Sequence, residues 1–173
     1  MPRSPSQRGL PLAVIDNTLL SRLVDLELAE SLPWVFKLIL IPPEVKREAY
    51  RKRHGGRRRL RNLIRESSGF FVNCREVDTS IRDFLKVDLD DGEAAAIAQA
   101  DFRNAILLLD EERGFRRAIM MQITVVRTLR LLNMLKDAGA IRDVRPYHEK
   151  LDQLGFYMTF EDRNQLLAEA GEL

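Results

Sequence analysis

The 173-residue sequence contains one cysteine, two histidines, nine glycines and seven prolines. Cys74 has no second cysteine with which to form an internal disulfide, which indicates a protein of the reducing cytoplasm. No apolar run approaches the roughly 18 residues needed to span a bilayer, so no membrane segment is predicted. With 45% hydrophobic and 31% charged residues, the composition excludes collagen-like and disordered chains and predicts a globular protein.

The N-terminal residues 1–11 differ in composition from the rest of the chain. They contain three prolines and two arginines, without the apolar stretch of a signal peptide. We therefore expect a flexible tail over 1–11 and a single domain over 12–173, a length that suffices to bury a core.

Charge is distributed unevenly along the chain. Residues 45–65, here called the basic segment, hold ten Lys or Arg residues and one acid, Glu48, which gives a net charge of +9 in a chain of net charge +2. The remainder of the chain therefore carries −7. A dense basic segment on an acidic protein is typical of a surface that binds a polyanion, although a solvated helix and loop would show the same pattern.

Short apolar runs alternate with segments of helical periodicity. The predicted strands span 12–15, 36–41, 70–77, 105–109 and 123–126. The predicted helices span 18–32, a segment from Pro43 onward, one or two pieces of the basic segment, 80–87, 90–102, a segment ending at Met121, 128–138, 147–154 and 161–170. Alternation of this kind predicts an α/β fold with a parallel sheet and helices on both faces.

Acidic residues follow two of the predicted strands. Asp16 comes directly after the first strand, and Asp110 follows the fourth. In open α/β sheets, sites form at the carboxyl ends of the strands, so these carboxylates would face each other if the two strands are neighbours. Glu48, one turn into the helix after the second strand, and Glu93, at the start of an alanine-rich helix, are placed to close the same pocket.

Such a group of carboxylates favours a hard divalent cation, Mg²⁺ or Mn²⁺, while two histidines argue against zinc. The matching chemistry is phosphodiester hydrolysis by an activated water. Each acid also has a simpler structural interpretation: Asp16 and Asp110 as helix caps, Glu93 as a partner of a helix dipole, and Glu48 as a partner of Arg51 or Lys52.

Several motifs together resemble those of PIN-domain proteins, in particular the small prokaryotic, VapC-like subgroup. The resemblance rests on Val14–Thr18, Ile41–Glu48, Leu89–Ile97 and Leu107–Glu111, and on the tail segments Leu154–Phe156 and Leu166–Glu172. Their order and spacing are more specific than any one of them, and the resemblance covers residues 12–172.

The resemblance implies a three-layer α/β/α fold with a parallel sheet of about five strands and a metal-dependent ribonuclease site. By position, the family's acidic residues are matched by Asp16, Glu48, Glu93 and Asp110, with Glu111 as an alternative for the fourth. The implied metal ligands are Asp16, Asp110, Glu93 and Glu111, with supporting hydroxyls at Thr18 and Thr128. Many relatives are toxins that are inhibited by a small antitoxin protein and that form homodimers.

Together with this resemblance, the sequence predicts a metal-dependent endoribonuclease that acts on RNA, with DNA also compatible with its charges and with no membrane partner. The residues predicted to bind nucleic acid are Arg51, Lys52, Arg53, Arg57, Arg58, Arg59, Arg61 and Arg127. Arg127 stands where the subgroup tends to have glycine, and would either add a phosphate contact or obstruct one. The alternative is a non-catalytic PIN-like protein that binds nucleic acid or a protein partner through Arg51–Arg65.

Overall fold

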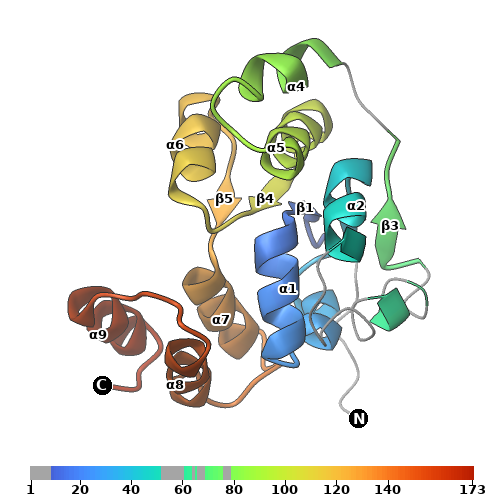
Figure 1. The fold of residues 1–173 in the computed structure, drawn as a ribbon. Coiled ribbons are helices and arrows are strands. Elements are labelled where there is room, and N and C mark those ends of the chain that lie inside the picture. Colours follow the sequence, from blue (N-terminus) through green and yellow to red (C-terminus); the bar gives the residue numbers. More distant parts are fainter. Residues whose placement is uncertain (1–8, 52–60, 64, 66–68, 76–78) are drawn as a thin grey trace.

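The computed structural model describes residues 9–51, 61–63, 65, 69–75 and 79–173. Within them lies a five-stranded, all-parallel sheet of order β3-β2-β1-β4-β5 (Figure 1). The strands are β1 (Leu12–Ile15), β2 (Leu38–Ile41), β3 (Phe71–Asn73), β4 (Ile106–Leu108) and β5 (Val125–Val126). The predicted α/β class with a parallel sheet is confirmed.

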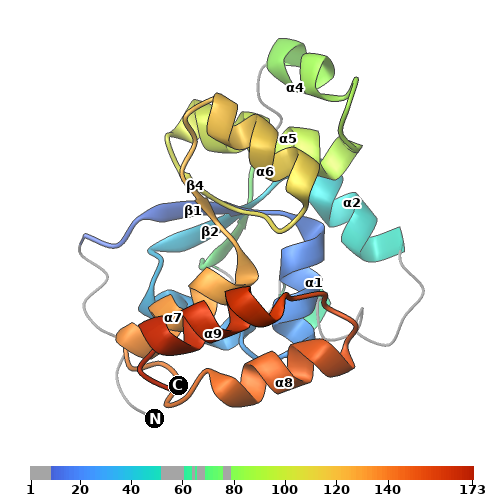
Figure 2. The same cartoon turned by 90° about the vertical axis from the view of Figure 1, so that its left-hand side faces the viewer.

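Helices cover both faces of the sheet. They are α1 (Asn17–Asp25), the 3-10 helix η1 (Ala29–Trp34), α2 (Pro43–Arg51), α4 (Thr79–Leu85), α5 (Asp91–Arg103), α6 (Glu112–Met120), α7 (Thr128–Asp137), α8 (Arg145–Gln153) and α9 (Phe160–Glu169). Figure 2 shows α4, α5 and α6 on one side of the sheet and α1, α7, α8 and α9 on the other, which gives three α/β/α layers. No helix in the described part of the chain is long and apolar enough to cross a membrane.

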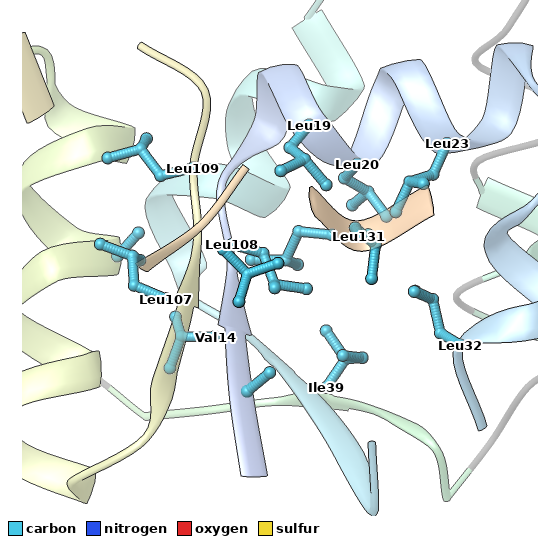
Figure 3. Packing of buried hydrophobic residues seen from close by; sticks show 14 of the residues in the cluster. Val14, Leu19, Leu20, Leu23, Leu32, Ile39, Leu107, Leu108, Leu109 and Leu131 are labelled. Carbon is cyan, nitrogen blue, oxygen red and sulfur yellow. The ribbon is translucent and has the colours of Figure 1, made fainter. Parts of the chain in front are cut away.

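The core forms where α1 and α7 meet the sheet. The side chains of Ala13, Val14 and Ile15 on β1 are fully buried, because this central strand is covered on both faces. Figure 3 shows leucines of α1, β4 and α7 packed together, among them Leu20 and Leu131. Each fully buried leucine contributes about 1.5–3 kcal/mol of hydrophobic free energy. This packing holds α1 and α7 against the strands whose ends carry the acids.

The prediction of one helix over 18–32 is wrong. The α1 helix ends at Asp25, and Glu27 then takes a left-handed conformation with a φ of 61°. The amide of Leu28 bonds back to the carbonyl of Leu23, a helix-terminating pattern, before η1 begins. The apolar spacing continued through this turn because η1 also buries residues against the core.

Four strands are shorter than predicted, and the fourth lacks one residue at each end. The second begins at Leu38 because the amide of Phe36 bonds to Leu32 and belongs to the end of η1. The third strand ends at Asn73, and the fifth has only two residues. At both, the apolar run in the sequence is longer than the segment that pairs with the neighbouring strand. The two pieces of helix predicted in the basic segment lie largely outside the described residues.

The strand order creates a switch point at the centre of the sheet. From β1, the chain builds outward to β2 and β3 on one side, and then to β4 and β5 on the other. In the β1–β4 pair Ile15 is in register with Leu108, and the amide of Asp16 bonds to the Leu108 carbonyl at 3.0 Å. The carboxyl ends of these neighbouring strands are therefore where a site is expected in this class of fold.

Candidate active site

Asp16 lies at the carboxyl end of β1 and is 2% exposed. Its Oδ2 accepts a hydrogen bond from the amide of Thr18 at 2.8 Å, so the side chain caps α1 as the structural interpretation predicted. Burial raises the pKa of Asp16 against the opposing effect of these backbone hydrogen bonds, and the charge of Asp90 raises it further. Because a carboxylate has about four acceptor positions, capping leaves Asp16 able to bind another group.

Glu93 lies in the first turn of α5, within a capping box. Its amide donates to Asp90 Oδ1 at 2.8 Å, and its Oε2 accepts from the Asp90 amide at 3.3 Å. Burial raises the pKa of Glu93 to about 7, and the charges of Asp90, Asp16 and Glu111 add to this effect. These four acids therefore share one electrostatic environment at the switch point. Asp90 was not predicted as a site residue, although it lies within the motif Leu89–Ile97.

Glu48 reaches the same region from α2, which packs against α5. A Cβ atom added to Gly92 would lie 2.6 Å from Glu48 Oε2. Only glycine therefore lets the Glu48 carboxylate sit against the first turn of α5, one residue before Glu93. Glu48 and Glu93 thus lie on adjoining elements, and their joint role in one pocket stays a prediction.

Asp110 follows β4 and is held by two side chains. Thr128, fully buried at the start of α7, donates from its hydroxyl to Asp110 Oδ2 at 2.6 Å and from its amide to Oδ1 at 2.8 Å. Arg22 of α1 forms an ion pair with the same Oδ2. The cap interpretation of Asp110 is wrong, because the N-cap residue of α6 is Glu111.

Arg22 is a second residue of the candidate site, after Asp90, that the sequence analysis missed. Its guanidinium packs over the ring of Phe156, 4.3 Å from the ring centroid, while its side chain is 19% exposed. Burial lowers the pKa of Arg22, and the charge of Asp16 acts in the opposite direction. The sequence feature that could have pointed to Arg22 is that it is the only basic residue of the α1 helix.

The donor set suits a hard divalent cation. The acids at the switch point are carboxylates, and oxygen is the ligand that Mg²⁺ and Mn²⁺ prefer. Across residues 9–51, 61–63, 65, 69–75 and 79–173, no three acidic, His or Cys side chains converge into a complete metal cage. Mg²⁺ commonly takes one or two carboxylates and keeps several waters, so the buried pair of Asp16 and Glu93 fits its coordination habits.

Comparison with protein families matches residues 12–172 to the PIN domain. The chain belongs to the PIN-domain family. The match covers both the strand-end acids and the helices after β5, and PIN domains form a nuclease superfamily. A search of the curated proteins finds no match.

The two predicted hydroxyl residues of this PIN domain differ in their contacts. Thr128 binds Asp110 through its hydroxyl, whereas exposed Thr18 binds Asp16 through its amide. Glu111 is exposed at the start of α6 and acts on Glu93 through its charge. Asp110 is therefore the buried acid of the pair, and Glu111 lies at the rim.

The predicted nucleic-acid contacts are described in part. Lys52, Arg53, Arg57, Arg58 and Arg59 lie outside the described residues. Arg51 and Arg61 are exposed, and Arg61 packs 6.0 Å from the centroid of the Tyr50 ring. In this PIN domain Arg127 donates to the Asp110 carbonyl at 2.9 Å and to Glu112 at 3.2 Å, which places a cation beside the acids.

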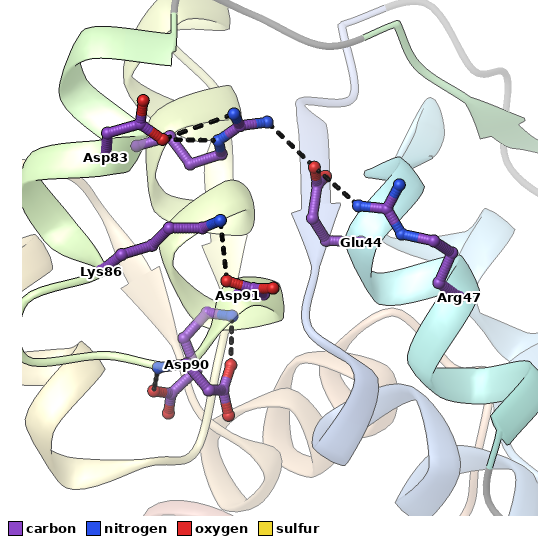
Figure 4. A network of polar contacts seen from close by, with 8 residues as sticks. Glu44, Arg47, Asp83, Lys86, Asp90 and Asp91 are labelled. Atoms are coloured by element: carbon purple, nitrogen blue, oxygen red, sulfur yellow. Dashed lines mark hydrogen bonds and ion pairs between the residues drawn. The ribbon is translucent and has the colours of Figure 1, made fainter.

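A second acid on α2, Glu44, has a structural role. It is 3% exposed and pairs with Arg47 at 3.1 Å and with Arg82 of α4 at 3.0 Å (Figure 4). In the same network Lys86 of α4 pairs with Asp91, at the start of α5. These contacts tie α4 to the helices that carry Glu48 and Glu93 and so help to position the site.

Proposed function

We propose that this protein is a metal-dependent endoribonuclease of the VapC-like subgroup that hydrolyses RNA phosphodiester bonds with Mg²⁺ or Mn²⁺. One observation carries the proposal: Asp16 and Glu93 are buried at the switch point, and burial together with neighbouring acids raises the pKa of each. Burying acids that repel one another costs free energy, and this cost is explained if the acids serve to bind a cation.

Asp16 and Glu93 would hold the cation directly, the other two predicted ligands, Asp110 and Glu111, would approach it once it is bound, and Glu48 would orient the attacking water. When bound, a divalent cation neutralises charge on the phosphate and lowers the pKa of bound water. Other residues of the protein fix the orientation of two of these acids. Thr128 fixes the orientation of Asp110, and the capping box with Asp90 fixes Glu93.

Basic residues at the rim would hold the substrate. Arg127 lies beside Asp110, and exposed Arg51 and Arg61 belong to the basic segment, which is suited to contacts with the phosphate backbone. A cytoplasmic location and a single domain over 12–173 are part of this proposal, since Cys74 is the only cysteine and the family match spans 12–172.

The first experiment compares cleavage of matched single-stranded RNA, hairpin RNA and DNA in Mn²⁺, in Mg²⁺ and in chelator. The wild-type protein should cleave RNA only with a metal present, and Asp16→Asn should abolish cleavage while retaining the fold. Asp101→Asn, an exposed position on α5, is the matched control and should cleave normally. Retained cleavage by Asp16→Asn would refute the assignment. Salt-sensitive RNA binding without cleavage would instead favour the non-catalytic alternative.

We further propose that the enzyme is the toxin of a toxin–antitoxin pair and forms a homodimer. Exposed apolar residues on and near α4 and α6 support a protein partner: Ile81, Phe84, Val87, Ile119 and Met120. A cavity of about 410 Å³ is lined by three of them, Ile81, Phe84 and Met120. Light scattering of the purified protein should give twice the mass of the 20.0 kDa chain, and expression should arrest growth in a manner that Asp16→Asn relieves. A monomeric mass would contradict the homodimer, and growth arrest by Asp16→Asn would contradict a toxin that acts through this site.

A further inference from the structure

We propose that a cavity beside Asp110 binds one unpaired nucleobase of the RNA substrate. The cavity has a volume of about 250 Å³ and is formed by the N-terminal part of α7, the segment that joins α8 to α9, and α9 itself. The inference rests on the proposed nuclease function and adds to it a recognition site for one base.

The cavity adjoins the acidic site. Asp110 and Arg127 both contribute to its lining, and Arg127 also donates to the Asp110 carbonyl. A group bound in the cavity is therefore next to the carboxylate that follows β4. In a nuclease, that position belongs to a nucleotide close to the bond that is cleaved.

The lining has the chemistry of a base-binding pocket. Leu129, Phe156, Met158 and Leu166 provide apolar surface, and Asp162 provides a polar group from α9. A nucleobase has flat apolar faces and a polar edge, so a pocket of this mixed character suits it. A base in a duplex has its faces stacked and its edge paired, so the occupant must be unpaired.

Tyr157 supplies a stacking surface at this cavity. It is 87% exposed, and in the described part of the chain its side chain makes no hydrogen bond, ion pair or ring contact. The neighbouring Phe156 ring already packs against Arg22. Stacking of a base on an exposed aromatic ring contributes about 1–3 kcal/mol. Of the two rings in the cavity lining, Tyr157 is therefore the one on which a base can stack.

The cations of the cavity suit an RNA backbone better than an apolar peptide. The side chains of Arg127 and Arg130 are 41% and 58% exposed, and both line the cavity. Arginine is well suited to phosphate through paired N–H donors. A nucleotide with its base beside Tyr157 would thus have its phosphate near these two side chains.

The test removes single bases from a cleavable RNA and measures kcat/KM with each abasic position. For the wild-type protein, one position flanking the cleaved bond should lower kcat/KM about tenfold, equivalent to about 1.4 kcal/mol. With Tyr157→Ala the intact RNA should already show this loss, and the same abasic position should add little. Tyr157→Phe keeps the ring and should restore the dependence. Phe160→Ala removes another exposed ring, one outside the cavity lining, and is the matched control.

A second readout does not require cleavage. A single-stranded RNA carrying the fluorescent base 2-aminopurine is bound to Asp16→Asn in chelator, and quenching reports stacking. Quenching at one position that disappears when Tyr157→Ala is added supports the base site, even if wild-type cleavage is never observed and the nuclease proposal fails. Cleavage with equal abasic effects in wild-type and Tyr157→Ala proteins overturns the base site alone. Unchanged RNA binding with weakened self-association in Tyr157→Ala would identify the cavity as a protein contact and also overturn it.

Discussion

Arg22 on α1 forms an ion pair with Asp110 at the end of β4, where the charge of Asp16, the most buried acid of the site, also acts on it. A guanidinium in this position neutralises a carboxylate that is also a proposed ligand of a divalent cation. Arg22 and the cation would therefore compete for Asp110, and the ion pair would stabilise the metal-free protein at the expense of metal affinity.

Replacing Arg22 with glutamine should separate these two effects. Without metal, Arg22→Gln should lower the free energy of unfolding by about 1–3 kcal/mol, because Asp110 loses a partly buried partner. Mn²⁺ should bind about fivefold more tightly, which corresponds to about 1 kcal/mol. Urea unfolding in chelator and calorimetric Mn²⁺ titration measure the two quantities. Arg116→Gln, at an exposed ion pair on α6, is the control, and unchanged Mn²⁺ affinity in Arg22→Gln would disprove the competition.

Thr128 offers a test of how Asp110 is oriented. Its buried hydroxyl donates to Asp110 Oδ2 at 2.6 Å. Thr128→Val removes that donor at nearly constant volume and should cost about 1.5–3 kcal/mol of stability, because the bond is made to a charged group. RNA cleavage should fall at least about tenfold. Thr128→Ser keeps the hydroxyl and should retain most of the activity; equal activity of the Val and Ser variants would show that the hydroxyl has no such role.

The positions of the two strand-end acids were predictable because short parallel strands limit where their carboxyl ends can lie. Once β1 and β4 are buried strands, Asp16 and Asp110 leave the sheet at one edge, and adjacency of the strands brings them together. The helical spacing from Pro43 and the motif before α5 likewise placed Glu48 and Glu93 at the elements that meet there.

Contacts made by long side chains were not predictable in the same way. Arg22 reaches Asp110 from a different element, and sequence spacing carries no information about that reach. The turn at Glu27 was missed because the apolar pattern runs on into η1, where burial continues in a different helical geometry. Periodicity reports burial, whereas the end of a helix depends on local backbone hydrogen bonds.

The raised pKa of Glu93 predicts how the stability of the metal-free protein depends on pH. Burial raises the pKa of Glu93 from 4.5 to about 7. Because the folded value lies above the unfolded one, stability from this group is complete below about pH 4.5 and is lost as the pH rises through 7. Glu93→Gln stays uncharged, so relative to wild type it should gain about 2–3 kcal/mol between pH 5 and pH 8.

Urea unfolding in chelator at the two pH values measures this gain. Glu161→Gln, an exposed glutamate in the first turn of α9, is the matched control and should show no such difference. A Glu93→Gln protein whose stability relative to wild type is the same at pH 5 and pH 8 would show that Glu93 is not held in an unfavourable charged state. The same variant should lose RNA cleavage if Glu93 is a ligand.

Glu172, near the C-terminal end of the described residues, should have the opposite effect on how stability depends on pH. Burial opposes its ionisation, but hydrogen bonds from Lys136 and from the amides of Val144 and Arg145 outweigh this and lower the pKa of Glu172 to about 2. Its contribution to stability is therefore complete above about pH 4.5 and is lost as the pH falls towards 2. Glu172→Gln should cost about 1–2 kcal/mol at pH 7 and less at pH 3, measured by urea unfolding against the exposed control Glu149→Gln. An equal cost at both pH values would mean that the carboxylate charge does not hold α8 to the chain end.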